Sequence, residues 1–155
     1  MNFPEAITPR TTPVPEIFGA QAYVSPDYAR AEADGLWPRV WQHACRLEDI
    51  AQVGDYVTYD IMDDTILIVR SSPDEISAFY NVCTHRGRRL AEGCGSVREF
   101  FCKYHAWRYN LKGECIRVLD PEDWGETLTQ DRLTLPRVKV DTWGGWVWIN
   151  MDPDC

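Results

Sequence analysis

The sequence has no long hydrophobic run and little positive charge. No stretch approaches the roughly 18 consecutive apolar residues of a membrane-spanning helix, and the first ten residues lack the basic and apolar regions of a signal peptide. The 24 acidic residues outnumber the 16 basic ones, and the net charge is −8. This balance disfavours nucleic acid as a partner, because phosphate binding depends on lysine and arginine. We therefore expect a cytoplasmic protein that binds neither membranes nor nucleic acid.

Histidine is also scarce, and no internal repeat is found. The chain has three histidines but six cysteines and seven tryptophans. In a cytoplasmic protein, cysteines serve more often as metal ligands or buried thiols than in disulfides. The 155 residues are enough for a single domain with a hydrophobic core.

The chain divides into three segments. Residues 1–19 contain four prolines and are typical of an extended N-terminal arm. Residues 20–53 are expected to form a helical lead-in. Ser25 is an N-cap candidate before Pro26, and a later Gly and Pro favour two short helices over one long helix. Residues 54–153 carry the strand signals.

The strand candidates are short runs of β-branched and aromatic residues separated by turn residues. They span 56–61, 65–69, 76–82, 99–102, 107–110, 114–118, 135–140 and 146–150. Many short strands at close spacing predict an antiparallel β-sandwich or a small barrel.

Two short motifs carry the chemistry. Cys83-Thr-His85 and Cys102-Lys-Tyr-His105 each supply one thiol and one imidazole. A [2Fe–2S] centre with mixed ligation needs two thiolates on one iron and two imidazoles on the other. Two facing loops, near 83–88 and 102–107, can meet this need. A zinc site built from the same residues is the alternative, although zinc fingers usually pair Cys with Cys and His with His in each half-site.

The residues around both motifs extend the pattern. They read Asn81-x-Cys83-x-His85-Arg-Gly87, then Cys102-x-Tyr104-His105-x-Trp107-x-Tyr109, and finally Gly145-Trp-Val-Trp-Ile-Asn-Met-Asp-Pro153. This text resembles the α subunits of Rieske non-haem iron ring-hydroxylating oxygenases over most of residues 20–153. The resemblance implies a mainly β fold, a Rieske-type antiparallel β-sandwich with a small cluster-binding subdomain, preceded by short N-terminal helices. It also implies a Rieske [2Fe–2S] cluster held by Cys83, His85, Cys102 and His105.

Three positions depart from related patterns. Ala106 stands where glycine is usual after the second histidine, and we expect little effect on ligation. Rieske proteins of cytochrome complexes resemble this motif but carry an extra disulfide-bonded cysteine in each box. Arg88 and Tyr104 occupy those positions here, so that disulfide cannot form. We expect a low-potential centre.

The resemblance implies one-electron transfer. A ferredoxin or an NAD(P)H-dependent reductase would donate the electron. The mononuclear iron of an oxygenase catalytic domain would accept it, commonly in a neighbouring subunit of a homotrimer. Such an iron takes two histidines and a carboxylate, and only His43 remains outside the two motifs. We therefore expect no mononuclear iron site and no hydroxylation by this chain alone, and we infer that it is the N-terminal Rieske domain of an α subunit.

Two other functions stay open. A free-standing Rieske ferredoxin would use the same motifs, although the long segment before the first strand argues against it. A zinc-stabilised binding module with no redox role is the third class.

Several residues near the motifs have two interpretations. Tyr104 and Trp107 either pack around the cluster and limit water access or belong to the ordinary core. Arg86, Arg88 and Arg89 form a basic spot that either steers an acidic electron donor or is a solvated loop.

The remaining candidates are interpreted structurally. His43 is expected on a helix face with a structural hydrogen bond. Trp143, Trp146 and Trp148 are either core residues or the surface that meets a catalytic domain. The spare thiols are Cys45, Cys94, Cys115 and Cys155.

Overall fold

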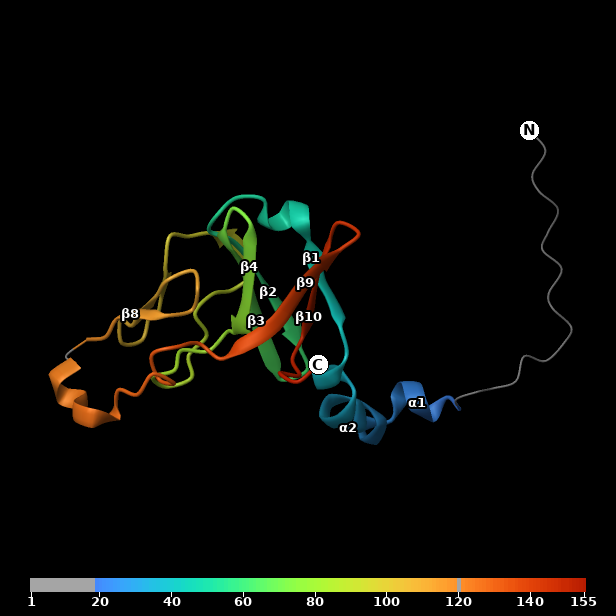
Figure 1. Cartoon of the computed structure of the whole chain (residues 1–155). Coiled ribbons are helices and arrows are strands. Elements are labelled where there is room, and N and C mark those ends of the chain that lie inside the picture. Colours follow the sequence, from blue (N-terminus) through green and yellow to red (C-terminus); the bar gives the residue numbers. More distant parts are fainter. Residues whose placement is uncertain (1–18, 120) are drawn as a thin grey trace, which may run out of the picture.

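Two antiparallel β-sheets form most of the structure (Figure 1). The computed structural model describes residues 19–119 and 121–155, so the arm expected at 1–19 lies outside the described residues except for residue 19. The larger sheet has seven strands in the order β1-β10-β9-β4-β3-β2-β5, and the smaller has three in the order β6-β7-β8. The fold is mainly antiparallel β, as the resemblance implies.

Short helical segments precede the larger sheet or connect strands. These are α1 (Gln21–Val24), α2 (Pro26–Gly35), η1 (Trp37–Arg39), η2 (Leu47–Ile50) and η3 (Pro121–Thr127). The strands are β1 (Gln42–Arg46), β2 (Asp55–Ile61), β3 (Asp64–Ser72), β4 (Glu75–Tyr80), β5 (Cys94–Ser96), β6 (Phe100–Phe101), β7 (Arg108–Tyr109), β8 (Cys115–Arg117), β9 (Arg137–Trp143) and β10 (Trp146–Asn150).

Strand β3 lies between two hydrophobic cores. Its central residues, 66–69, are fully buried, and successive side chains of a strand point to opposite faces of the sheet. Ile66 and Ile68 pack in one core with Val147 and Ile149. Leu67 and Val69 pack in the other, which also contains both cysteines of the two motifs. A strand buried on both faces reads as a continuous apolar run, which is how this segment appears in the sequence.

The helical lead-in begins as the sequence predicts. The Ser25 side chain accepts a hydrogen bond from the Asp27 backbone N–H at 3.2 Å, and Pro26 occupies the first helical position. Helix α2 ends at Gly35, and the short η1 follows it. The prediction of separate short helices in this segment is therefore confirmed.

The expectation of a helix around His43 is wrong. His43 lies in β1, a strand within residues 20–53, and β1 pairs with β10 at the edge of the larger sheet. A bulge between His43 and Cys45 shifts the register, so Gln42 and Cys45 are both buried. The apolar positions therefore do not alternate, and the usual strand signal is lost. Strand β5 was also not predicted, because its three residues are all exposed.

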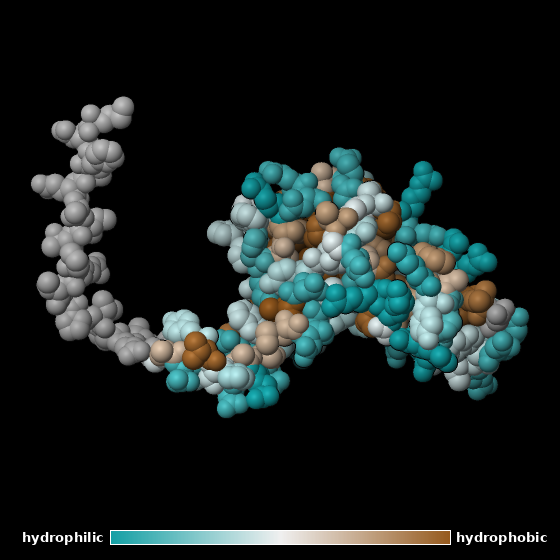
Figure 2. Space-filling model, turned by 180° about the vertical axis from the view of Figure 1, so that it is seen from behind, coloured by the Kyte–Doolittle hydropathy of each residue, from teal (hydrophilic) through white to brown (hydrophobic). Residues whose placement is uncertain are grey.

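The surface of the described part is mixed in character. From behind, hydrophilic residues dominate and hydrophobic ones appear in small separate groups (Figure 2). Within residues 19–119 and 121–155, no helix is both long enough and apolar enough to cross a membrane. All six cysteines are free thiols in the structure.

Candidate metal centre

The two motif loops share one backbone design. In each, the cysteine N–H donates to the carbonyl five residues later, and the N–H four residues later donates back to the cysteine carbonyl. The bonds run from Cys83 to Arg88 and from Gly87 to Cys83, both at 2.8 Å, from Cys102 to Trp107 at 2.8 Å, and from Ala106 to Cys102 at 3.0 Å. The two motifs therefore fold into matching loops, although the spacing between cysteine and histidine differs between them.

This loop design needs a left-handed residue at its fourth step. Gly87 has φ of +73°, and Ala106 has φ of +59° at the equivalent place. Glycine adopts this region at little cost, whereas a side chain with a Cβ is strained there. The positive φ explains why glycine is usual after the second histidine. It also makes Ala106 a strained residue.

The two motif cysteines lie together in the interior. Cys83 and Cys102 are each 1% exposed and belong to the same core. Burial raises the pKa of the Cys83 thiol, the Tyr109 hydroxyl beside it opposes that rise, and the neighbouring Cys102 adds to it. Tyr109 is fully buried, and its hydroxyl lies 3.3 Å from Cys83 Sγ. Burial also raises the pKa of Tyr109, so its hydroxyl keeps its proton and can donate to a thiolate.

The rings of the two motif histidines lie next to each other in an edge-to-face arrangement. The ring centroids of His85 and His105 are 4.5 Å apart. The Nδ1 atom of each ring is buried and has no hydrogen-bond partner. Burial lowers the pKa of His85, and the charges of His105, Arg86 and Arg132 lower it further. The neutral imidazole that results is the form that binds a metal through a ring nitrogen.

The four candidate ligands form two pairs and do not converge on one point. Within residues 19–119 and 121–155, no three His, Cys, Asp or Glu side chains are grouped to hold a single metal ion. A tetrahedral zinc site needs four donors about 2.0–2.3 Å from one ion. A Rieske cluster instead takes two thiolates on one iron and two imidazoles on the other. The pairing and the unpartnered Nδ1 atoms fit the two-iron arrangement.

Aromatic side chains surround the histidines. Trp107 is 1% exposed and stacks nearly parallel to His85, with centroids 5.2 Å apart. Tyr104 stacks on His105 at 3.8 Å and is itself exposed. Arg86 is exposed and contributes positive charge near His85. The expected neighbours are thus brought to the histidines, and Trp107 also belongs to the core, so its two interpretations do not conflict.

Trp124 is a neighbour that the sequence reading did not identify. It lies in η3, and its ring packs edge-on against His85 at 5.0 Å and against Trp107 at 5.4 Å. A cleft of about 360 Å³ opens beside the histidines. Its lining is His85, His105, Trp107, Leu119, Asp123 and Trp124. A single tryptophan within an acidic stretch was the only sequence signal for this contact.

The Asn81 side chain stabilises the first loop by hydrogen bonds to the backbone that follows it. Its side chain is buried and accepts hydrogen bonds from the backbone N–H groups of Leu90 and Ala91 at 3.0 and 3.2 Å. Its amide also donates to the Ala91 carbonyl at 2.7 Å. These hydrogen bonds join the segment before the first loop to the segment after it. Asn81 belongs to the sequence motif, but the motif alone does not show this role.

Comparison with known proteins agrees with this geometry. Residues 40–130, more than half of the chain, match the Rieske [2Fe–2S] domain family. The chain belongs to this family. The cofactor of a Rieske domain is a [2Fe–2S] cluster with mixed thiolate and imidazole ligation.

Curated relatives of this Rieske domain are oxygenase subunits. The carnitine monooxygenase oxygenase subunit of Escherichia coli (strain K12) is 32% identical over 136 residues, which cover 87% of this chain and 36% of the relative. The anthranilate 1,2-dioxygenase large subunit of Acinetobacter baylyi is 29% identical and is covered to 28% of its length. The chain thus spans about a third of the relatives it matches.

Solved structures give the same result. The apo form of a quaternary ammonium Rieske monooxygenase superposes with a TM-score of 0.79 at 30% identity, covering 87% of this chain and 39% of that one. A naphthalene 1,2-dioxygenase superposes with a TM-score of 0.75 at 31% identity, covering 82% and 29%. The fold of the Rieske domain is therefore shared with both kinds of oxygenase.

The strain at Ala106 predicts a stabilising substitution. Ala106→Gly should raise the free energy of unfolding by about 0.5–1 kcal/mol, because glycine relieves the left-handed conformation. The melting temperature should rise by about 2–4 °C per kcal/mol. Ala51→Gly is the matched control, since Ala51 has φ of −71° and glycine there should lower stability. A lower melting temperature for Ala106→Gly would contradict the assignment of strain.

The hydroxyl of Tyr109 predicts an effect on reduction potential. Tyr109→Phe removes a donor to Cys83 Sγ, and this donor favours the more negative, reduced state of a cluster bound there. A differential interaction of about 1 kcal/mol corresponds to a decrease of about 40 mV in the midpoint potential of a one-electron couple. Redox titration followed by circular dichroism measures this decrease. Tyr28→Phe, on the distant α2, should leave the potential unchanged.

Proposed function

We propose that this Rieske domain transfers single electrons within an oxygenase α subunit, with Cys83, His85, Cys102 and His105 as cluster ligands. One observation carries the assignment. Two matching loops each carry one buried thiol and one histidine with a buried, unpartnered Nδ1 atom. When bound, the [2Fe–2S] cluster accepts and releases one electron at a time.

The surrounding residues hold the ligands and keep water out. The paired backbone bonds of each loop fix the direction of its cysteine. The hydroxyl of Tyr109 also lies 2.9 Å from Thr84 Oγ1 and accepts the Thr84 N–H at 3.1 Å, which anchors the first loop to β7. Trp107 covers the His85 ring. A dry, fixed environment keeps the structural change on reduction small, which favours fast electron transfer.

The histidine cleft is the proposed exit for the electron. His85 and His105 line it and are only partly buried, whereas both cysteines are inside the core. An acceptor seated in this cleft comes closest to the imidazoles. The proposed acceptor is the mononuclear iron of a catalytic domain, in a neighbouring subunit of a homotrimer.

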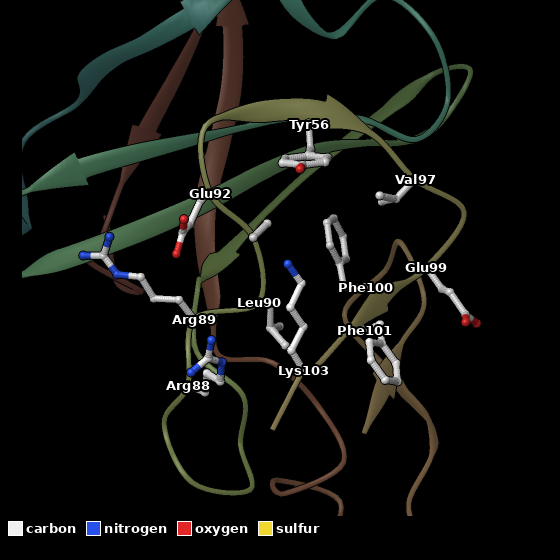
Figure 3. A pocket seen from close by; sticks show the side chains of 11 residues that line it. Tyr56, Arg88, Arg89, Leu90, Glu92, Val97, Glu99, Phe100, Phe101 and Lys103 are labelled. Atoms are coloured by element: carbon white, nitrogen blue, oxygen red, sulfur yellow. The ribbon is translucent and has the colours of Figure 1, made fainter. Parts of the chain in front are cut away.

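A separate groove is the proposed docking site for the electron donor. The groove has a volume of about 330 Å³ and lies between the two ligand loops and β2. Figure 3 shows Lys103 extending toward Tyr56, between two arginines on one flank and two phenylalanines on the other. Its floor residues Leu90 and Phe100 belong to the core that holds Cys83 and Cys102. A donor seated here is separated from the thiols by a few packed side chains.

The charges of the groove favour an acidic partner. Arg89 pairs with Asp60 at 3.4 Å, and Glu99 is neutralised by Arg108 at 2.6 Å. Arg88, Lys103 and Glu92 line the groove without an ion pair in the part of the chain that the structure describes, so the unpaired charges leave an excess of one positive charge. In a chain of net charge −8, this positive spot would orient an acidic ferredoxin or reductase.

An electron paramagnetic resonance spectrum tests the cluster assignment. The dithionite-reduced protein should give a rhombic signal with an average g below that of an all-thiolate ferredoxin. Chemical assay should find about two irons and two sulfides per chain. Stoichiometric zinc without sulfide, persisting after cluster reconstitution, would replace this proposal with a zinc-stabilised module.

Paired variants test the individual ligands. Cys83→Ser and His85→Gln should each lose the signal and most of the iron. Cys94→Ser and His43→Gln are the matched controls, because Cys94 is exposed in β5 and His43 lies in β1. Both controls should keep the full iron content and the rhombic signal.

Charge reversal tests the donor groove. Arg88→Glu with Arg89→Glu should slow cluster reduction by a reduced acidic [2Fe–2S] ferredoxin about tenfold or more at low salt, because electrostatic steering is lost. The difference should shrink as ionic strength rises. Arg30→Glu with Arg39→Glu makes the same charge change on the helical lead-in and should leave the rate unchanged. Equal reduction rates for the two double variants would contradict the proposed docking site. Reduction by dithionite shows separately whether each variant still contains a reducible cluster.

A further inference from the structure

A cluster of tryptophans lies on the larger sheet away from the cluster-binding loops. Trp41, Asp141, Trp143 and Trp148 line a hollow of about 280 Å³. Trp41 directly precedes β1, and the others lie in β9 and β10. These three strands lie at the opposite end of the molecule from β8 and η3 (Figure 1). We propose that this hollow, called here the tryptophan hollow, binds a small quaternary ammonium cation.

The sheet register brings these residues to one face. Trp148 of β10 lies opposite Asp141 of β9, and Trp146 lies opposite Trp143 in the same pair of strands. Side chains alternate along a strand, so the residues between them, such as Val147, point to the buried core. The opposite face of β10 therefore carries a row of aromatic rings.

The rings of the tryptophan hollow are set at an angle to one another. The centroids of Trp143 and Trp148 are 6.4 Å apart, with 56° between the ring planes. The Trp148 indole N–H donates to the Trp143 carbonyl at 3.3 Å, which fixes the Trp148 ring. His43 packs against the same ring at 5.8 Å from the other neighbouring strand. Trp143 is nevertheless 76% exposed and Trp41 45% exposed, an unusual exposure for the largest apolar side chains.

The carboxylate of Asp141 supplies the charge. It accepts a hydrogen bond from the Thr142 N–H at 2.7 Å. Across residues 19–119 and 121–155, it takes part in no ion pair. An apolar protein surface seated on this face would bury the carboxylate without a partner, which is costly. A cation avoids that cost, and the chain's net charge of −8 attracts cations.

Ring chemistry selects the kind of cation. The faces of indole rings attract positive charge, and aromatic cages of this kind recognise quaternary ammonium groups. A quaternary nitrogen donates no hydrogen bond, so it needs only ring faces and a nearby carboxylate. Because the hollow is open, the dissociation constant should be on the order of millimolar.

Titration with matched probes tests the proposal. Purified holoprotein is titrated with choline, with tetramethylammonium, and with 3,3-dimethylbutan-1-ol, the uncharged isostere of choline, at constant ionic strength. Indole N–H signals of the hollow should shift in nuclear magnetic resonance spectra with both cations, whereas the signal of Trp37 in η1 should not. The alcohol should bind at least tenfold more weakly. Equal binding of the alcohol would reduce the hollow to an apolar patch and overturn the proposal.

Variants of exposed residues complete the test. Trp143→Ala and Asp141→Asn should each weaken choline binding about tenfold and leave the melting temperature nearly unchanged, because both side chains are exposed. Tyr23→Ala and Asp63→Asn are the matched controls and should bind choline as the unaltered chain does. Unchanged binding by Asp141→Asn would also overturn the proposal. The iron content and paramagnetic signal report independently on the Rieske centre.

Discussion

The hydroxyl of Tyr109 joins the two halves of the candidate centre. Its ring comes from β7, directly after the second ligand loop, and its backbone pairs with Phe100 on one side and Cys115 on the other. Its oxygen reaches Cys83 and Thr84 in the first loop. The Thr84 hydroxyl in turn donates to the Arg132 carbonyl at 2.5 Å. One buried hydroxyl therefore links the smaller sheet to the first loop and, through Thr84, to the segment before β9.

The second organising feature is the sharing of β3 between two cores. One core stabilises the larger sheet and the other encloses the thiols, and neighbouring residues of β3 enter both. The thiol core also includes the floor of the proposed donor groove. The histidine cleft opens elsewhere, beside η3. The packing thus gives the site a dry interior and two separate approaches, one near the cysteines and one at the imidazoles.

The sequence predicted most strands and singled out the candidate ligand pairs because both depend on local patterns. The motif spacing marks Cys83 and His105 as candidates without any knowledge of the fold, and the apolar run at 66–69 marks a buried strand. The sequence did not predict β1, because a bulge removes the alternation around His43. It also missed the contact of Trp124 with His85, since this contact joins residues far apart in the chain. Such contacts depend on long-range packing, which periodicity and spacing do not encode.

The burial of the thiols has a consequence for how the centre is made. Cys83 and Cys102 are each 1% exposed beneath loops that are closed by backbone hydrogen bonds. An assembling cluster can reach both sulfurs only while these loops are apart. With Cys83 and Cys102 as the proposed ligands, iron and sulfide would have to enter while the two loops are open, so cluster insertion would depend on opening of the thiol core.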